Sequence, residues 1–252
     1  MLGIGGYISP TYEHLYSLDF DGTGDGTSAG DVLDFGTADY SIAFWFKAAE
    51  FQNGDDQFLF AKRQDANNRV ELAIANSSGK IMIVTRGGGT NTGQVIGASD
   101  ASSLENTWVH VCATVDRSAN MVLYVNGTTT LGGTVSIGSS SSQTLNNTGV
   151  LTFGCRDISV NKPFTGKMTD IAIWNIALSD AHVLGLYNDG PADLRFPRRL
   201  GTVQQYDAEA AAGLVGLWRC NDGSGSTLKD ELGNSNATIA GTKAFSTDTP
   251  DD

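Results

Sequence analysis

Short runs of β-branched and aromatic residues, each closed by Gly, Asn, Asp or Ser, recur along most of this chain. Such runs are typical of strands separated by tight turns. The run Tyr40–Lys47 is apolar on both of its alternating faces, which predicts a central strand covered on both sides. The runs at 58–61, 69–74 and 80–84 are parted by polar turn segments and predict a meander. The pattern therefore favours an all-β fold.

Two further runs, 108–115 and 121–125, flank a polar turn, and Asn126-Gly127 after them predicts a tight hairpin. A short helix is expected at 180–187, because Ser179 is a suitable N-cap at its start.

We expect the helix to turn Val183, Leu184 and Tyr187 toward a sheet. A weaker, Ala-rich helical pattern covers 206–213.

The chain has 252 residues, a length that all-β sandwiches of about 200–250 residues reach as one domain. Its 31 Gly against 5 Pro agree with many tight turns. We predict a short N-terminal arm, residues 1–16, and a single domain, residues 17–252. The segment 213–245 is expected to complete that domain, because the termini of sandwiches often lie close together.

The net charge of −12 argues against nucleic acid and anionic lipid surfaces as partners. No run reaches the roughly 18 apolar residues that a membrane span needs, so no membrane association is expected. The first ten residues lack the basic and apolar regions of a secretion signal. Cys112, Cys155 and Cys220 are odd in number and widely spaced, which favours buried free thiols over disulfides.

Three stretches resemble the laminin-G-like and pentraxin-like branch of the concanavalin A-like lectin/glucanase superfamily. They are Leu18–Asp25 followed by the run Ile42–Phe46, then Asn106–Val111 with Leu123–Gly127, and finally Phe164–Ser179. This resemblance implies a two-sheet antiparallel jelly-roll sandwich with one short helix.

A fourth stretch, 213–225 followed by Asp230 to Asn234, resembles a block that precedes the domain in many secreted members of this superfamily. Here the block comes last. This order, with the Gly-rich start of the chain, resembles tailed-bacteriophage virion proteins. That resemblance is an analogy of arrangement.

Enzymatic chemistry is not expected. Glycoside hydrolases on such a fold need two carboxylates that flank the scissile bond. Asp19 and Asp21 share one face of a strand, but no matching Glu accompanies them. His14, His110 and His182 are too scattered for a zinc cluster, and His110 is expected to be a hydrogen-bonded structural histidine.

No cofactor is required by any motif, but a structural calcium ion is a candidate. Related jelly-rolls often hold one ion beside the loop that resembles 230–234, and hard cations bind carboxylate and carbonyl oxygens. Asp170, Asp230 and Asn234 are the candidate ligands. The alternative is that Asp230 and Asn234 build an Asx-type turn, with Asp170 at a strand end.

Glycan binding would use exposed aromatic rings against sugar faces, with Asn and Asp at loop rims for the hydroxyl groups. Five aromatic residues are available, but all lie in strand patterns that a two-layer core would bury. They are Trp45, Trp108, Trp174, Trp218 and Tyr124.

Two functions remain open. The first is a non-enzymatic bacteriophage virion surface protein, a capsid decoration or tail component, that contacts other virion proteins and copies of itself in a symmetric assembly and has a possible glycan-binding or adhesion role. The second is a lectin-like carbohydrate-binding adhesion module that is not part of a virion, is extracellular and recognises cell-surface glycans.

Overall fold

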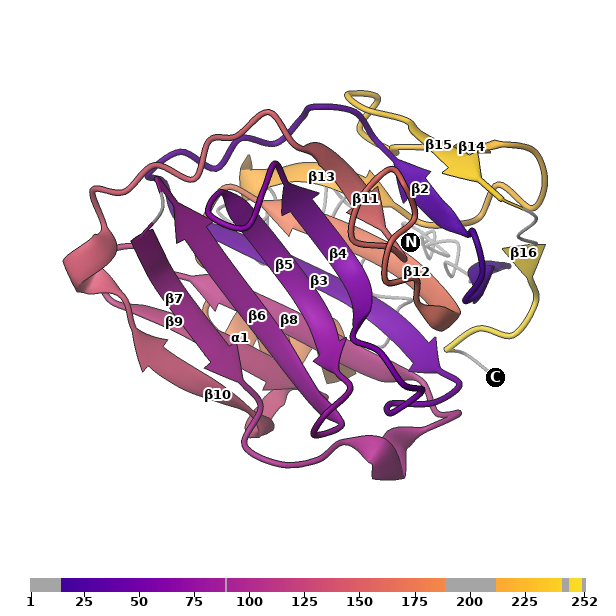
Figure 1. Cartoon of the computed structure of the whole chain (residues 1–252), viewed down its shortest axis with the longest axis horizontal. Helices are drawn as coiled ribbons and strands as arrows, with labels where there is room; N and C mark the ends of the chain where they lie inside the picture. Colours follow the sequence, from indigo (N-terminus) through magenta and orange to yellow (C-terminus); the bar gives the residue numbers. More distant parts are fainter. Residues whose placement is uncertain (1–14, 89, 189–211, 242–244, 251–252) are drawn as a thin grey trace, which may run out of the picture.

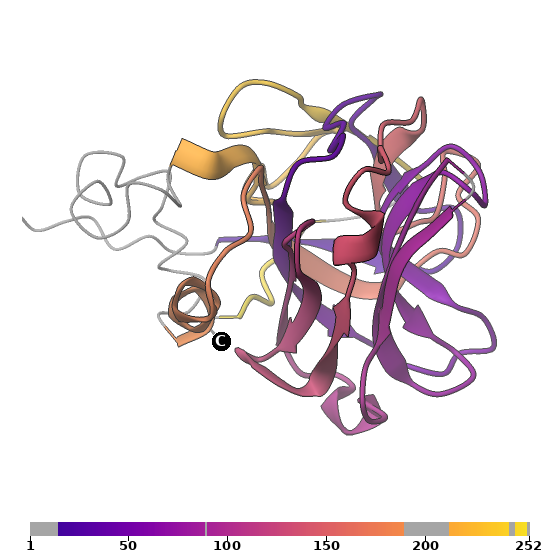
Figure 2. The same ribbon diagram turned by 90° about the vertical axis from the view of Figure 1, so that its left-hand side faces the viewer.

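Two antiparallel sheets pack face to face and form the body of the protein (Figures 1 and 2). The computed structural model describes residues 15–88, 90–188, 212–241 and 245–250. The architecture is an all-β jelly-roll sandwich with one short α-helix in the described residues, as the sequence predicts. The predicted arm (1–16) and the predicted helical patch (206–213) lie outside this description, apart from residues 15–16 and 212–213.

The large sheet contains eight of the described strands. They are β1 (Ser17–Asp21), β3 (Tyr40–Ala48), β8 (Val109–Val115), β9 (Asn120–Val125), β10 (Thr128–Ser136), β12 (Thr165–Trp174), β13 (Leu214–Trp218) and β16 (Phe245–Ser246). Their order is β10-β9-β8-β3-β12-β1-β16, and β13 pairs with the second half of β12. The predicted turn between β9 and β10 is confirmed, because Asn126 and Gly127 both have positive φ, at 50° and 72°.

A five-stranded sheet covers one face of the large sheet. Its strands, in order across the sheet, are β11 (Val150–Phe153), β4 (Gln57–Arg63), β5 (Arg69–Ala75), β6 (Lys80–Gly87) and β7 (Thr90–Ile96). The predicted meander is therefore confirmed as β4-β5-β6.

A small third sheet contains β14 (Thr227–Leu228), β15 (Ala237–Ala240) and β2 (Gly26–Ser28). Two short 3-10 helices lie at Ser102–Leu104 and Gly138–Ser140.

Strand β3 is central, as its two-sided apolar pattern predicts. It pairs with β8 along one edge and with β12 along the other. Phe44 and Phe46 point into the core between the two sheets, whereas Ala43 belongs to a second apolar cluster on the outer face of the large sheet. Removing each buried aromatic side chain from water contributes roughly 2–3 kcal/mol, so this alternation anchors both layers to one strand.

Helix α1 (Asp180–Asn188) packs on the outer face of the large sheet (Figure 2). The predicted N-cap is present, since the amide of His182 donates to Ser179 Oγ at 3.3 Å. Val183 and Leu186 are fully buried against the sheet, whereas the side chain of Leu184 is 44% exposed. The prediction for Leu184 was therefore wrong. Val183 and Leu186 are three residues apart and share one face of the helix, whereas Leu184 lies beside that face.

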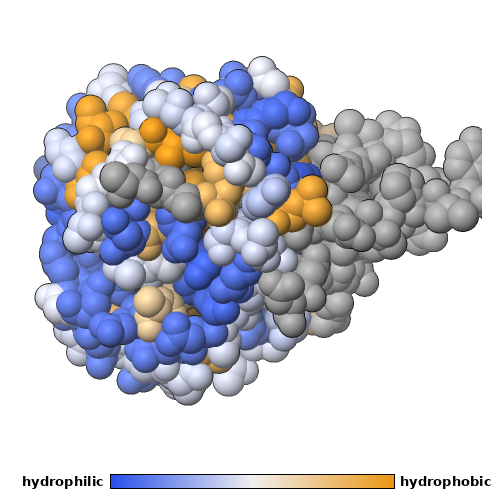
Figure 3. Space-filling view, turned by 90° about the vertical axis from the view of Figure 1, so that its right-hand side faces the viewer, coloured by the Kyte–Doolittle hydropathy of each residue, from blue (hydrophilic) through white to orange (hydrophobic). Residues whose placement is uncertain are grey.

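The C-terminal segment contributes strands to two sheets. β13 and β16 join the large sheet, and β14 and β15 join β2 of the small sheet. This side of the molecule carries only scattered hydrophobic residues among polar ones (Figure 3). In the described residues, no helix combines the length and the apolar character that a membrane-spanning helix needs.

The three cysteines are free and buried, as predicted. His110 is also buried, but neither of its ring nitrogens has a hydrogen-bond partner among the described residues. The expected hydrogen-bonded histidine is thus wrong: the ring lies 5.2 Å from the ring of Trp45 and 6.2 Å from the ring of Tyr187, measured between centroids. Burial in this aromatic cluster lowers the pKa of His110 to about 3.

The stability of the protein should therefore fall as the pH drops from about 6.5 toward 3. Over this range the unfolded state binds a proton at His110 that the folded state does not bind, which gives a slope of about 1.4 kcal/mol per pH unit. Urea unfolding at a series of pH values should show a shallower slope for His110→Gln than for the wild type. His182→Gln, which leaves His110 in place, is the control; an unchanged slope in His110→Gln would contradict the assignment.

Candidate functional site

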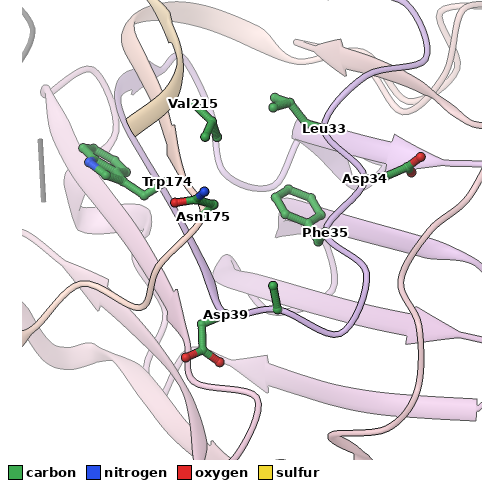
Figure 4. Close-up of a pocket in the computed structure, with 8 residues that line it drawn as sticks. Leu33, Asp34, Phe35, Asp39, Trp174, Asn175 and Val215 are labelled. Atoms are coloured by element: carbon green, nitrogen blue, oxygen red, sulfur yellow. The ribbon is translucent and has the colours of Figure 1, made fainter. Parts of the chain in front are cut away.

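A cleft of about 350 Å³ opens at one end of the sandwich (Figure 4). It lies between the segment 33–39, which precedes β3, and the adjoining ends of β12 and β13. Trp174 and Asn175 line it from β12 and the residue after it, and Val215 lines it from β13. The volume falls within the range of about 300–1,000 Å³ that is usual for small-molecule sites.

The floor of the cleft is apolar. The ring of Phe35 stacks on the ring of Tyr40, with centroids 4.2 Å apart and an interplanar angle of 28°, so Phe35 is held in place and is only 8% exposed. Leu33 has a φ of +60°, a left-handed conformation that is strained for a leucine. Such strain persists only where the surroundings enforce it, and it is common at binding sites.

Polar groups surround this floor. Asp34 Oδ1 accepts a hydrogen bond from the amide of Asn147 at 3.2 Å, and Asp39 Oδ1 accepts one from the amide of Arg117 at 2.7 Å. Among the described residues, the second carboxylate oxygen of each Asp and the side-chain amide of Asn175 make no hydrogen bond. The exposed side chain of Asn175 therefore presents an acceptor and donors at the cleft, whereas the carboxylates of Asp34 and Asp39 point away from it (Figure 4).

Two buried cations hold the segment that forms the cleft. Lys62 is fully buried and forms ion pairs with Asp31 and with Asp34, the latter at 3.7 Å. Arg117 is 3% exposed and donates to the carbonyl oxygens of Gly36, Ser140 and Gln143. Because the cations bind backbone and side-chain oxygens, the rim is fixed before any ligand arrives.

The predicted ligand Asp230 lies in the loop after β14 and is 1% exposed. Its Oδ1 accepts hydrogen bonds from the amides of Leu217 and Leu232, both at 3.1 Å, and its Oδ2 accepts two more, both at 3.0 Å, from the amides of Asn234 and Ser235. The alternative of an Asx-type turn is what the structure shows.

The second predicted ligand, Asp170, lies in the middle of β12 and not at a strand end. It has a φ of +51° at the bulge between Thr169 and Ala172. Its carboxylate is buried beside the guanidinium of Arg219, with Oδ1 and Nη1 3.5 Å apart.

These residues do not fit a calcium ion in their present arrangement. The oxygens of Asp230 are engaged by backbone amides, and Asp170 is paired with a cation. No group of three His, Cys, Asp or Glu residues in the described part of the chain is placed to hold a metal. Calcium binding by Asp170, Asp230 and Asn234 remains a prediction, which a calcium titration followed by calorimetry checks.

The aromatic residues considered for sugar stacking are mainly core residues, as expected. Trp45, Trp174, Trp218 and Tyr124 are at most 7% exposed. Trp108 differs: it is half-buried, and its Nε1 donates to Asp248 Oδ1 at 3.0 Å.

Residues 21–184 match a laminin-G family model described as the concanavalin A-like lectin/glucanases superfamily. The match covers more than half of the chain. The chain belongs to this family. No curated protein sequence matches it significantly.

Several solved structures share the fold of this chain. A Bacteroides ovatus protein named for an inferred carbohydrate-binding role has a TM-score of 0.62 at 15% identity, over 93% of this chain; the chain spans 60% of that protein's length. The heptameric SAP-like pentraxin of Limulus polyphemus has a TM-score of 0.52 at 16% identity, covering 69% of this chain and 82% of that one. A CBM40 module of a Ruminococcus gnavus sialidase, solved with α2,3-sialyllactose, has a TM-score of 0.51 at 16% identity, covering 68% and 95%.

The cleft includes residues that the sequence analysis did not select. Asp34, Phe35 and Asp39 precede β3 in a segment that mixes acidic and apolar residues. That mixture is the feature of the sequence that could have pointed to these residues. Trp174 was selected as an aromatic candidate, but its role as a wall of the cleft depends on the position of β13.

Replacing Asp230 with Ala should lower the free energy of unfolding by about 3 kcal/mol, because four buried amides lose their acceptor. Urea denaturation measures this loss. The neighbouring Glu231→Ala removes only an exposed pair with Lys229 at 3.7 Å and should cost less than about 0.5 kcal/mol. Equal effects in the two variants would show that the Asp230 carboxylate does not brace the loop.

Proposed function

We propose that this protein is a non-catalytic carbohydrate-binding module that holds a sugar in the cleft at the end of the sandwich. The observation that carries the proposal is the combination of an apolar floor with the exposed side-chain amide of Asn175, which makes no hydrogen bond within the described protein. Sugars present the same two surfaces, since C–H groups cluster on one face of the ring and hydroxyl groups project from its edge.

In this proposal each part of the cleft has one task. Leu33 and Val215 contact the apolar face of the sugar beside the edge of Phe35. The side-chain amide of Asn175 donates hydrogen bonds to hydroxyl groups of the sugar and accepts them. Because backbone amides hold Asp34 and Asp39, the segment that carries Leu33 and Phe35 is ordered before a sugar binds.

The related folds support this function and an extracellular location. Besides the CBM40 module bound to sialyllactose, domain 4 of an extracellular arabinanase from Geobacillus stearothermophilus was solved with arabinotriose; its TM-score is 0.50 at 17% identity, over 68% of this chain and 76% of that one. From these proteins we transfer to this chain only the class of ligand, a carbohydrate.

The proposed module does not hydrolyse its ligand. Asp34 and Asp39 both lie at the cleft, but one oxygen of each holds a neighbouring loop, which suits positioning more than proton transfer. Incubation with oligosaccharides should release no product, and a shortened product would contradict this part of the proposal.

The virion hypothesis is a separate proposal on which the cleft has no bearing. It predicts that mass spectrometry of purified phage particles detects this chain. It also predicts that deletion of residues 1–16 prevents assembly and leaves sugar binding intact.

Asn175→Ala should weaken binding of a neutral oligosaccharide, found on a glycan array, by about tenfold, because hydrogen bonds to sugar hydroxyls are lost. The melting temperature should not change, since the exposed side chain makes no hydrogen bond within the described residues. Isothermal titration calorimetry measures the affinity.

The matched control is Gln52→Ala, which removes an exposed amide beyond the opposite end of β3 and should leave the affinity unchanged. Ala38→Trp fills the rim of the cleft and should abolish binding. An array without any bound glycan, or full affinity in both cleft variants, would refute the proposal.

A further inference from the structure

Three arginines form a row across the five-stranded sheet. Arg63 in β4 is directly opposite Arg69 in β5, and Arg69 is directly opposite Arg86 in β6. Residues in register on neighbouring strands point to the same face, with Cβ atoms about 5 Å apart. We call Arg63, Arg69 and Arg86 the arginine ladder. It lies outside the cleft and has no part in the sugar contacts proposed above.

In the part of the chain that the structure describes, one carboxylate forms ion pairs with the ladder. Glu71, two residues after Arg69 on the same face of β5, has a side chain only 3% exposed. Its Oε1 lies 2.7 Å from Arg63 Nη1, and its Oε2 lies 3.1 Å from Arg69 Nη1. Among the described residues, Glu71 is therefore the one carboxylate that pairs with any of these three arginines, while the more distant positive charge of Arg63 also helps to lower the pKa of Asp65.

Arg86 forms no ion pair with a carboxylate in the described part of the protein. Its Nη1 donates to the backbone carbonyl of Ala66 at 3.5 Å, a long and weak contact. The Nε groups of both Arg69 and Arg86 are buried and lack a hydrogen-bond partner within the described residues. A buried donor without an acceptor costs free energy, so the ladder is held in an unfavourable arrangement.

The arrangement is electrostatically costly. Like charges directly opposite one another destabilise a sheet. Burial lowers the pKa of Arg69. The negative charge of Glu71 acts in the opposite direction, whereas the positive charges of Arg63, Arg86 and Arg156 lower this pKa further. Arg156 is paired with Asp157 at 3.3 Å, and Asp65, on the turn after β4, bonds to Asn67 and Asn68. A chain with a net charge of −12 thus concentrates cations at one place on its surface.

We propose that the arginine ladder binds an oxyanion, the carboxylate or sulfate of an acidic glycan. Guanidinium groups present paired N–H donors that match both oxyanions, and an anion seated on the ladder would relieve the repulsion among the three charges. That the anion belongs to a sugar rests on the proposed function.

The position of the ladder supports a sugar as the carrier. Lys62, which precedes Arg63 in β4, forms its ion pair with Asp34 at the cleft rim. The ladder and the cleft consequently lie at the same end of the sandwich. Nucleic acid would be repelled by the negative charge of the rest of the chain.

The first experiment titrates the full chain with three hexasaccharides at low ionic strength: chondroitin sulfate, its desulfated form and neutral N-acetylchitohexaose. Binding of the sulfated form alone assigns a sulfate, and binding of both acidic forms assigns a carboxylate.

Arg86→Gln should weaken binding of the acidic ligand about tenfold. Lys229→Gln, which removes a 60% exposed cation elsewhere, should change it by less than about twofold. Equal affinity for acidic and neutral hexasaccharides, or full affinity in Arg86→Gln, overturns the proposal.

A second experiment separates the ladder from the cleft. Inorganic sulfate should raise the melting temperature of the wild type more than that of Arg86→Gln. Sulfate also stabilises proteins in general by salting out, but this effect is the same for both proteins and cancels when their two melting-temperature shifts are compared. Asn175→Ala should keep the full sulfate response. A sulfate response without binding of any hexasaccharide refutes the glycan ligand, whereas loss of neutral-sugar binding alone refutes only the cleft. Equal responses of wild type and Arg86→Gln refute the oxyanion site itself.

Discussion

The pairing of β12 with β3 is the interaction on which the rest of the structure depends. β3 is bonded to β12 on both sides of the bulge at Asp170, and the other edge of β12 is shared by β1 and β13. Segments from the two ends of the chain are thereby joined to one strand. The bulge has a structural reason, because it places the buried carboxylate of Asp170 beside Arg219.

The cleft follows from that pairing. β12 ends at Trp174, and β13 begins beside it, so their ends form one wall. The opposite wall is the segment before β3, which has no regular structure of its own and is held by Lys62 and Arg117. A loop fixed by buried cations on a rigid sheet is a suitable place for a binding site, since the ligand need not order it.

The sequence predicted the fold well because its signals are local. Alternation in Tyr40–Lys47 reflects a strand with two apolar environments, and Asn126-Gly127 reflects the positive φ angles of a tight turn. Leu184 was misplaced because neighbouring helix positions differ by about 100° and only the sheet decides which stripe is covered. For His110, the sequence predicted a hydrogen-bonded structural histidine, but its aromatic neighbours come from β3 and α1, which no local pattern shows.

The amino-acid sequence by itself determined the class of fold, the turns between strands, the family and the excess of negative charge. Only the tertiary structure decided where binding groups gather. The segment 33–39 and Asn175 line one cleft through the topology of the sheets, and Arg63, Arg69 and Arg86 form a row through strand register. The physical reason is that local patterns report how each residue meets its neighbours along the chain, whereas a site is made by long-range pairing, which one sequence does not encode in any local signal.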